Sequence, residues 1–258
     1  MEIIAVVNQK GGVGKTTTCM NLAASLAAIN KKVLILDLDS QGNASTGVGV
    51  EHSRRDKNLY GCFIGQYSLD EVICDTAIKN LFICPSTIDI AAAELNLKDR
   101  VSREFILKNK ILELSQNFDY VIIDCPPSLN LLTVNALAAS DEVIIPVQCE
   151  FFALEGLSHL LKTIRMIQKR INPTLSIRGI LITMFDRRNK IAIQVAREIK
   201  KHLGSKLFDT VIPRNVKISE APSFGKPAIV YDYNCKGAQA YIRLVKEMLA
   251  QNKKLRVA

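Results

Sequence analysis

Near its N-terminus the chain passes from a strand-like apolar segment through a glycine-rich loop into a helix-like segment, and few folds accommodate this order. Residues 3–7 read Ile-Ile-Ala-Val-Val, and residues 9–18 read Gln-Lys-Gly-Gly-Val-Gly-Lys-Thr-Thr-Thr. A short β-branched run without a polar face suits a strand of a parallel sheet that is covered on both sides. The glycine loop that joins it to a helix therefore indicates an α/β fold with the loop at the carboxyl end of the strand.

The same alternation of strand-like and helix-like segments continues along the chain. It predicts a doubly wound, mainly parallel twisted sheet flanked by helices, in a single domain over residues 1–258 with no separate N-terminal domain. Residues 40–80 contain five glycines and should form loops and short helices. The predicted strands are 2–8, 33–38, 81–84, 119–124, 142–147, 177–184 and 209–212. The predicted helices are 15–29, 88–98, 102–117, 129–139, 153–171, 190–203 and 237–252.

The glycine-rich loop is suited to hold the phosphates of a nucleoside triphosphate. Consecutive backbone N–H groups can surround phosphate oxygens, and glycine permits the close approach and the dihedral angles that this needs. The Lys15 ammonium would bind the outer phosphates, the Thr16 hydroxyl would bind Mg²⁺, and the following helix would add its positive N-terminal dipole. The residues predicted to bind nucleotide here are Lys10, Gly11, Gly12, Val13, Gly14, Lys15, Thr16 and Thr17.

Two later strand-like runs end in aspartate, one at Asp37 and Asp39 and the other at Asp124. Ligands of doubly wound sheets lie at the carboxyl ends of the strands, so these carboxylates should face the phosphates. We expect Asp39 to polarise the attacking water and Asp124 to hold Mg²⁺, through water, beside Thr16. Asp37 would support either the loop or the Mg²⁺ shell. The predicted metal-site residues are Thr16, Asp39 and Asp124, and the predicted catalytic residues are Lys10, Lys15 and Asp39.

Loops 183–189 and 212–217 follow the last predicted strands and are candidates for the site of a purine ring. Asn215 or the nearby backbone would read the base, while Met184 and Pro213 would give it apolar contact. Ordinary surface loops are the alternative.

A second lysine, Lys10, opens the glycine-rich loop. Lys15 already serves the phosphates of its own subunit, so we expect Lys10 to reach the nucleotide of a partner subunit. Such a cation would stabilise charge in the transition state and make activity depend on a homodimer. A solvated lysine without a role is the alternative.

The positive charge of the chain is concentrated in one segment. The net charge is +9, but residues 160–226 alone hold 15 Lys and Arg against four acidic residues, an excess of +11. A polyanion partner would gain affinity there through counterion release, whereas solvated helix faces are the alternative.

Composition favours a cytoplasmic protein without a membrane-spanning segment. The chain has no apolar run near the roughly 18 residues of a membrane span and no signal-peptide pattern. Its seven cysteines form no CxxC pair and are expected to be reduced thiols.

Residues 10–17, Lys-Gly-Gly-Val-Gly-Lys-Thr-Thr, match the deviant Walker A signature of the ParA/Soj and MinD group of ATPases. The chain resembles ParA/Soj partitioning proteins over nearly its full length. It departs a little from them, since Ser40 stands where many relatives carry proline and Lys217 where arginine is frequent. The matching segments are 39–44, 123–129, 146–156, 181–188 and 211–223.

The resemblance implies ATP and Mg²⁺ as cofactors and an ATP-dependent sandwich homodimer in which Lys10 crosses the interface. It further implies weak intrinsic hydrolysis, stimulated by a ParB-type centromere-binding protein, and nonspecific binding of double-stranded DNA by the ATP dimer on the nucleoid. The implied DNA-binding residues are Arg188 and Lys217, with Arg187, Lys190, Arg197, Lys200 and Lys201 as neighbours.

Three other functions compete with this one. A MinD-like, membrane-associated cell-division ATPase would need a C-terminal amphipathic helix, but the apolar stripe over 241–249 is expected to pack in the core. Only Leu255 and Val257 remain beyond it, so we expect no stable membrane anchor.

An iron–sulfur relative would need two exposed cysteines, for which Cys125 and Cys149 are the candidates. A nucleotide-binding scaffold would lack catalysis. Operator-specific repression is not expected, because no helix-turn-helix segment precedes the first strand.

Overall fold

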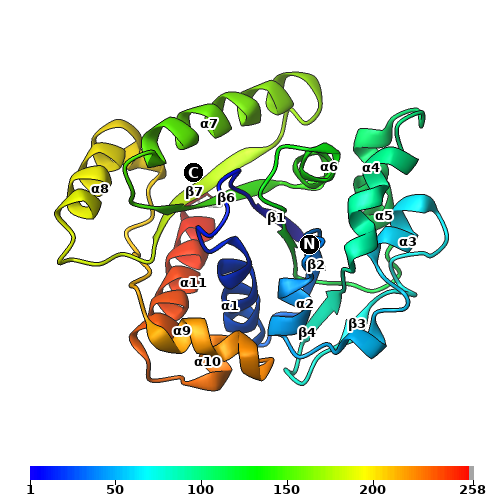
Figure 1. Ribbon diagram of the computed structural model, residues 1–258, viewed down its shortest axis with the longest axis horizontal. Coiled ribbons are helices and arrows are strands. Elements are labelled where there is room, and N and C mark those ends of the chain that lie inside the picture. Colours follow the sequence, from blue (N-terminus) through cyan, green and yellow to red (C-terminus); the bar gives the residue numbers. More distant parts are fainter. Residues whose placement is uncertain (256–258) are drawn as a thin grey trace.

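A seven-stranded sheet forms the centre of the protein (Figure 1). The computed structural model describes residues 1–255, so Val257 of the predicted apolar tail lies outside the described residues. The strands follow the order β3-β4-β2-β5-β1-β6-β7, and every neighbouring pair is parallel except β3 and β4. The strands are β1 (Glu2–Val6), β2 (Val33–Asp37), β3 (Cys74–Asp75), β4 (Leu81–Cys84), β5 (Tyr120–Asp124), β6 (Glu142–Gln148) and β7 (Ser176–Thr183).

Helices cover both faces of this sheet. The α-helices are α1 (Lys15–Ala27), α2 (Asn43–Gly47), α3 (Leu59–Ile64), α4 (Ala93–Asn96), α5 (Ile106–Leu112), α6 (Leu131–Ala139), α7 (Ala153–Arg170), α8 (Lys190–Leu203), α9 (Val216–Glu220), α10 (Ala228–Tyr231) and α11 (Lys236–Leu255). Short 3₁₀ helices are η1 (His52–Arg54), η2 (Ile88–Ala92), η3 (Arg103–Phe105), η4 (Gly204–Lys206) and η5 (Ala221–Phe224).

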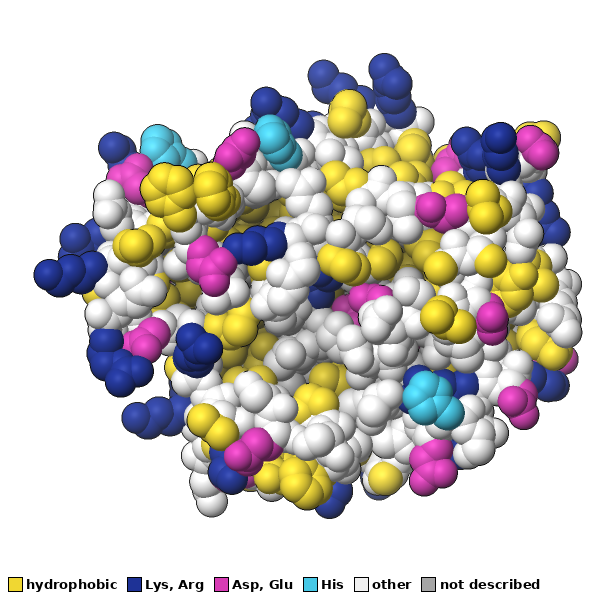
Figure 2. Space-filling view, viewed as in Figure 1, with side chains coloured by type: hydrophobic (Ala, Val, Ile, Leu, Met, Phe, Trp, Pro, Cys, Tyr) yellow, Lys and Arg dark blue, Asp and Glu magenta, His cyan; other side chains and the backbone are white. Residues whose placement is uncertain are grey.

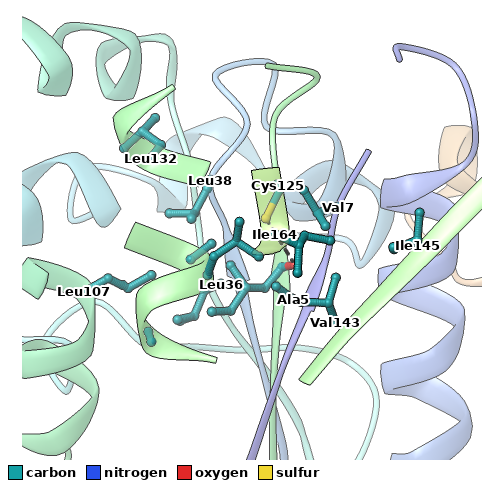
Figure 3. Packing of buried hydrophobic residues seen from close by; sticks show 14 of the residues in the cluster. Ala5, Val7, Leu36, Leu38, Leu107, Cys125, Leu132, Val143, Ile145 and Ile164 are labelled. Carbon is teal, nitrogen blue, oxygen red and sulfur yellow. Dashed lines mark hydrogen bonds between the residues drawn. The ribbon is translucent and has the colours of Figure 1, made fainter. Parts of the chain in front are cut away.

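Two large apolar clusters, one on each face of the sheet, form most of the core, and a small third cluster contains Ala221, Ala228 and Ala238. Ala5 and Leu36 point to the face that α5, α6 and α7 cover, where Leu107, Leu132 and Ile164 meet them (Figure 3). The alternate strand residues, among them Ile4 and Ile35, point to the opposite face, which packs against α1 and α11. Because both faces of every central strand are buried, these strands contain apolar residues at nearly every position.

The predicted fold class is confirmed, and most elements lie within three residues of their predicted bounds. The predicted strand 209–212 is wrong. The backbone N–H groups of Asp209 and Thr210 donate to the Glu247 carboxylate of α11, at 2.7 and 2.9 Å, instead of to a neighbouring strand. Isolated bridges, Ile180 with Leu207 and Phe185 with Pro213, and a hydrogen bond from Ile212 N to the Ile182 carbonyl at 2.9 Å connect this segment to the edge of the sheet without forming a strand.

Two predicted helices are shorter or less regular than expected. The segment 88–98 is η2 followed by α4, and 102–117 is η3 followed by α5, which ends at Leu112. Side chains from other elements accept hydrogen bonds from backbone N–H groups near the two ends of α5. Leu107 N donates to Asn135 Oδ1 at 3.1 Å, and Ser115 N donates to Asp70 Oδ2 at 3.0 Å. Within 40–80 the expected loops and short helices occur, together with β3, a strand of two residues that has no sequence signal.

An ion-pair cluster joins the amino ends of the sheet. The Arg178 side chain, which is 4% exposed, donates to Glu142 Oε2 at 2.6 Å and lies 3.4 Å from Glu2 Oε1. It also donates to the Met248 carbonyl of α11 at 2.6 Å. One side chain therefore links β7 to β1, β6 and the last described helix.

Candidate nucleotide site

The glycine-rich loop lies at the carboxyl end of the central strand β1 and leads directly into α1 (Figure 1). Gly12 and Gly14 have φ of 74° and 87°, in the left-handed region that favours glycine. The loop is held from outside, because the Thr183 hydroxyl at the end of β7 donates to the Val13 carbonyl at 2.8 Å. Asn8 anchors its beginning by accepting a hydrogen bond from Lys10 N at 3.0 Å and donating to the Pro146 carbonyl at 2.7 Å.

Lys15 is buried inside the loop, with only 6% of its surface exposed. Its ammonium donates to the Lys10 carbonyl at 3.1 Å. Burial lowers the pKa of Lys15, while the nearby Asp124, Cys125 and Asp39 oppose this change. The structure therefore brings the predicted phosphate lysine together with Asp124 and Asp39, two of the three predicted strand-end carboxylates.

Asp124 is the most unusual group of the site. It is fully buried, and neither of its carboxylate oxygens has a hydrogen-bond partner within the described part of the chain. Burial raises the pKa of Asp124 well above its usual range, and the charge of Asp37 adds to the rise. The Thr16 hydroxyl opposes the rise, although it forms no hydrogen bond of good geometry with the carboxylate. Buried oxygens without partners are costly unless a cation or a donor satisfies them, so this carboxylate beside Thr16 fits a Mg²⁺ shell.

Asp37 and Asp39 have different surroundings although they are two residues apart. Asp37 is fully buried and accepts hydrogen bonds from Ser45 N at 2.9 Å, Ser45 Oγ at 2.7 Å and Asp39 N at 3.3 Å. Burial raises its pKa to about 6. Asp37 therefore supports the loop, which was one of its two predicted roles. Asp39 is half-buried, and its Oδ1 accepts from Gln41 N at 3.0 Å. Its other oxygen has no hydrogen-bond partner among residues 1–255 and is available to a ligand.

Met184, Pro213 and Asn215 line one cavity of about 230 Å³ next to Gly14 and Thr17 of the loop. The predicted base residues and the phosphate loop thus share one site. Met184 has a φ of 49°, a left-handed conformation uncommon outside glycine. Asn215 caps the N-terminus of α9, because its Oδ1 accepts a hydrogen bond from Lys217 N at 2.9 Å.

The inner wall of this cavity comes from the last described helix. Tyr241 of α11 lines the cavity, and its hydroxyl lies 3.2 Å from Thr18 Oγ1 of α1. The first and the last described long helices therefore meet behind the nucleotide site.

Lys10 forms an ion pair with Glu150 of its own chain, at the end of β6. Both side chains remain about half exposed, at 42% and 47%. Next to this pair, Phe151 and Phe152 are 77% and 66% exposed. Lys10 therefore lies outside the pocket that holds Lys15, as expected of a residue directed to a partner subunit. In this structure its ion pair is with a residue of its own chain.

The predicted DNA-binding residues lie on or near α8 and α9. Figure 2 shows Lys and Arg side chains projecting along the edge that α8 forms. Two of these residues are already paired: Arg188 with Asp186 at 2.8 Å and Lys217 with Glu220 at 3.0 Å. The paired Arg188 lowers the pKa of Asp186 to about 2.

Sequence reasoning gave no role to Thr183, Glu150 or Asn8, which hold the loop or Lys10. All three stand at or just beyond the carboxyl end of a predicted strand, and that position is the one signal that could have identified them.

Comparison with known proteins identifies the family. A family model described as an AAA domain matches residues 1–177. The sporulation initiation inhibitor protein Soj of Bacillus subtilis (strain 168) is 52% identical over 249 residues, which cover 96% of this chain and 98% of that protein. The chromosome partitioning protein ParA of Caulobacter vibrioides (strain NA1000 / CB15N) is 45% identical over 255 residues, which cover 98% of this chain and 96% of that protein. The chain belongs to the ParA/Soj family.

The ParA/Soj fold is shared with solved structures. Cobyrinic acid a,c-diamide synthase from Mycobacterium smegmatis, with bound ADP and magnesium, is 33% identical and superposes with a TM-score of 0.85 over 98% of this chain and 96% of that chain. The ParA/Soj assignment confirms the predicted family, and together with this neighbour it supports an ATPase that uses ATP and Mg²⁺.

Burial of the α11 stripe and of two cysteines bears on two competing interpretations. Tyr241, Val245 and Met248 of the α11 stripe are buried in the core, and Leu249 packs against it. Among the described residues, no helix is long and apolar enough to cross a bilayer. Cys125 and Cys149 are buried, and burial raises the pKa of Cys149 to about 11, so these two thiols are not the exposed pair that an iron–sulfur bridge requires.

Proposed function

We propose that this ParA/Soj-family chain is a partitioning ATPase in which Mg-ATP closes a homodimer and the dimer binds double-stranded DNA without sequence preference. A ParB-type centromere-binding protein stimulates its weak intrinsic hydrolysis, and hydrolysis releases the DNA. The protein would act in the cytoplasm, on the nucleoid. The observation that carries the proposal is the buried Asp124 carboxylate without partners, placed beside Lys15, Thr16 and Asp39 at the end of the central strands.

Each residue has a separate task in this proposal. The loop N–H groups and Lys15 bind the triphosphate, while Thr16 and Asp124 hold the metal, Asp124 through water. The metal, when bound, neutralises phosphate charge and orients the oxygens. Asp39, with one carboxylate oxygen not engaged by the loop, accepts hydrogen bonds from the attacking water and aligns it. Met184, Pro213 and Asn215 hold the purine ring.

Dimer formation would use the exposed surface around Lys10. The exposed Phe151 and Phe152 provide apolar area beside Lys10, and such aromatic residues are enriched at interfaces. In the dimer Lys10 leaves Glu150 and binds the phosphates of the partner's nucleotide, because these phosphates carry more negative charge than one carboxylate.

DNA binding would use the basic edge formed by the residues implied by the family. Arg188 and Lys217 would exchange their carboxylate partners for backbone phosphates, with Arg187, Lys190, Arg197, Lys200 and Lys201 nearby. Because both ion pairs are accessible to solvent and therefore weak, these exchanges cost little.

DNA co-sedimentation with ATP, with ADP and without nucleotide, at several salt concentrations, tests the function. We expect binding only with ATP, and a steep loss of binding as salt rises. Equal binding in all three nucleotide states would refute the ATP-dependent switch, and binding to liposomes but not to DNA would support the MinD-like alternative.

A further inference from the structure

A second cavity, of about 570 Å³, shares Pro213 and Arg214 with the base cavity. We call it the basic groove. Phe185, Val211, Asn234 and Gln239 contribute to its lining, which contains no acidic residue. Its four cationic residues, all exposed, are Arg187, Arg214, Lys236 and Arg243.

The charges of the basic groove are only weakly opposed: Asp186, the nearby acid paired with Arg188, has its pKa lowered by Arg214 as well. Within the described part of the chain, none of its four cationic side chains has a carboxylate oxygen within 4 Å. Arg188 and Lys217 nearby are both paired with acids. Cations that converge on a concave surface without counter-charges repel one another, and an anion that enters the groove relieves this repulsion.

The first turns of α11 add to the positive potential. Lys236 is the first residue of this helix, and Gln239 and Arg243 follow at spacings that place them on the same face. The partial positive charge at the N-terminus of a helix of 20 residues therefore lies at the same groove as the four cations.

The wall between the two cavities is held by backbone hydrogen bonds. Ile212 N donates to the Ile182 carbonyl at 2.9 Å, Phe185 N to the Ile212 carbonyl at 3.0 Å, and Arg214 N to the Phe185 carbonyl at 3.1 Å. A purine that contacts Pro213 on one side therefore acts on the segment that positions Arg214 and Phe185 on the other side.

We propose that the basic groove binds phosphates of a DNA backbone, with Arg214, Lys236 and Arg243 joining Arg187 as contact residues, and that the shared wall couples this binding to the nucleotide in the base cavity. The proposal deepens the proposed function and depends on it. By linkage, DNA must then raise the affinity for ATP by the same factor as ATP raises the affinity for DNA.

The test uses the full chain with Lys236→Ala and Arg243→Ala combined, which leaves the base cavity residues in place. A fluorescent DNA duplex is titrated with the wild type and the double variant, at several salt concentrations and with a non-hydrolysable ATP mimic. A second titration measures affinity for the mimic with and without DNA. Lys98→Ala combined with Lys108→Ala is the matched control, because it removes the same charge from exposed positions on and beside α4 and α5, at the opposite end of the molecule from α8 (Figure 1).

We expect the double variant to bind DNA roughly tenfold or more weakly, with a salt slope smaller by about 1 for each lost contact. Its affinity for the mimic without DNA should equal that of the wild type, but DNA should no longer raise that affinity. The control should match the wild type in DNA affinity, in salt slope and in affinity for the mimic with and without DNA. Unchanged melting temperatures would show that both variants fold.

Three results would overturn the proposal. A double variant that keeps the DNA affinity and salt slope of the wild type would refute the groove alone and leave the proposed function standing. Two equivalents of nucleotide per protomer, reduced to one in the double variant, would assign the groove to free nucleotide. A wild type that binds no DNA with the mimic would refute both the groove and the proposed function.

Discussion

At the scale of single residues, three neighbouring carboxylates of the site differ in their hydrogen-bond partners. Asp37 is saturated by Ser45 and by the backbone of its own loop, Asp39 keeps one oxygen available, and Asp124 has no partner in the described chain. These differences arise from tertiary contacts. They explain why the sequence could place the acids at strand ends but left two roles open for Asp37.

Asp39→Ala is expected to permit ATP binding and dimerisation but to reduce turnover by at least about 100-fold, because the attacking water loses its acceptor. Phosphate release and fluorescent-nucleotide binding measure the two effects separately. Asp56→Ala removes an exposed acid elsewhere and should leave both unchanged. Normal turnover in Asp39→Ala would remove Asp39 from the catalytic role.

Asp124→Asn should stabilise the nucleotide-free protein at pH 7.5 by about 1 kcal/mol while weakening Mg²⁺-dependent ATP binding, a trade-off common at functional sites. The buried Asp37 and Asp124 both have pKa values raised in the folded state. The folded protein therefore holds more protons than the unfolded chain, and their contribution to stability falls as pH rises from about 4 through about 6 and above.

Urea unfolding at pH 5 and pH 7.5 measures this effect. The variant should lose part of the pH dependence, and the exposed Asp56→Asn should retain all of it. A variant that is less stable than the wild type at both pH values would contradict the argument that the Asp124 charge is unsatisfied without ligand.

At the scale of secondary-structure elements, the central strands could be predicted because burial on both faces makes their sequence apolar throughout. The strand predicted at 209–212 failed because apolar runs do not reveal that Glu247, far along the chain, takes the N–H groups of Asp209 and Thr210. Helix 102–117 was predicted too long for a similar reason, since Asn135 and Asp70 bind backbone groups near its ends. Side chains that bind backbone over long sequence separations give no local signal.

Arg178→Met should destabilise the protein by about 3 kcal/mol at pH 7.5, because it leaves Glu142 partly buried without its cation. Burial raises the pKa of Glu142 and Arg178 opposes this rise, so the variant should protonate Glu142 more readily. Its deficit in unfolding free energy should therefore be smaller at pH 5 than at pH 7.5. Arg165→Met, at an exposed position of α7, should change stability by less than about 0.5 kcal/mol. Equal effects of the two substitutions would show that the ion-pair cluster contributes nothing.

At the scale of the whole molecule, the phosphate loop and the base cavity adjoin each other at the carboxyl end of one sheet, and the basic edge lies beside them. The conformation of the glycine-rich loop could be predicted almost completely from the sequence, because its left-handed backbone positions, Gly12 and Gly14, are occupied by glycine. The basic edge was found only as a charge excess, since which cations are paired depends on the folded surface.

Lys10→Ala should stay monomeric with a non-hydrolysable ATP mimic, while the wild type doubles in mass by light scattering. The physical reason is that repulsion between two bound triphosphates across the interface would no longer be offset by a cation. Lys31→Ala, which also removes an exposed lysine from an ion pair, should dimerise normally. A Lys10→Ala variant that binds the mimic and still doubles in mass would refute the cross-subunit role.

The contact between Thr18 and Tyr241 joins segments that are far apart in the sequence, so α1 leaves the ribosome long before α11. A nascent chain that has formed its glycine-rich loop still lacks the Tyr241 wall of the cavity until α11 has emerged. We therefore expect a chain without α11 to gain no protection from ATP. A fragment ending at residue 230 should be digested by protease at the same rate with and without the nucleotide, whereas the full chain should be digested more slowly with it.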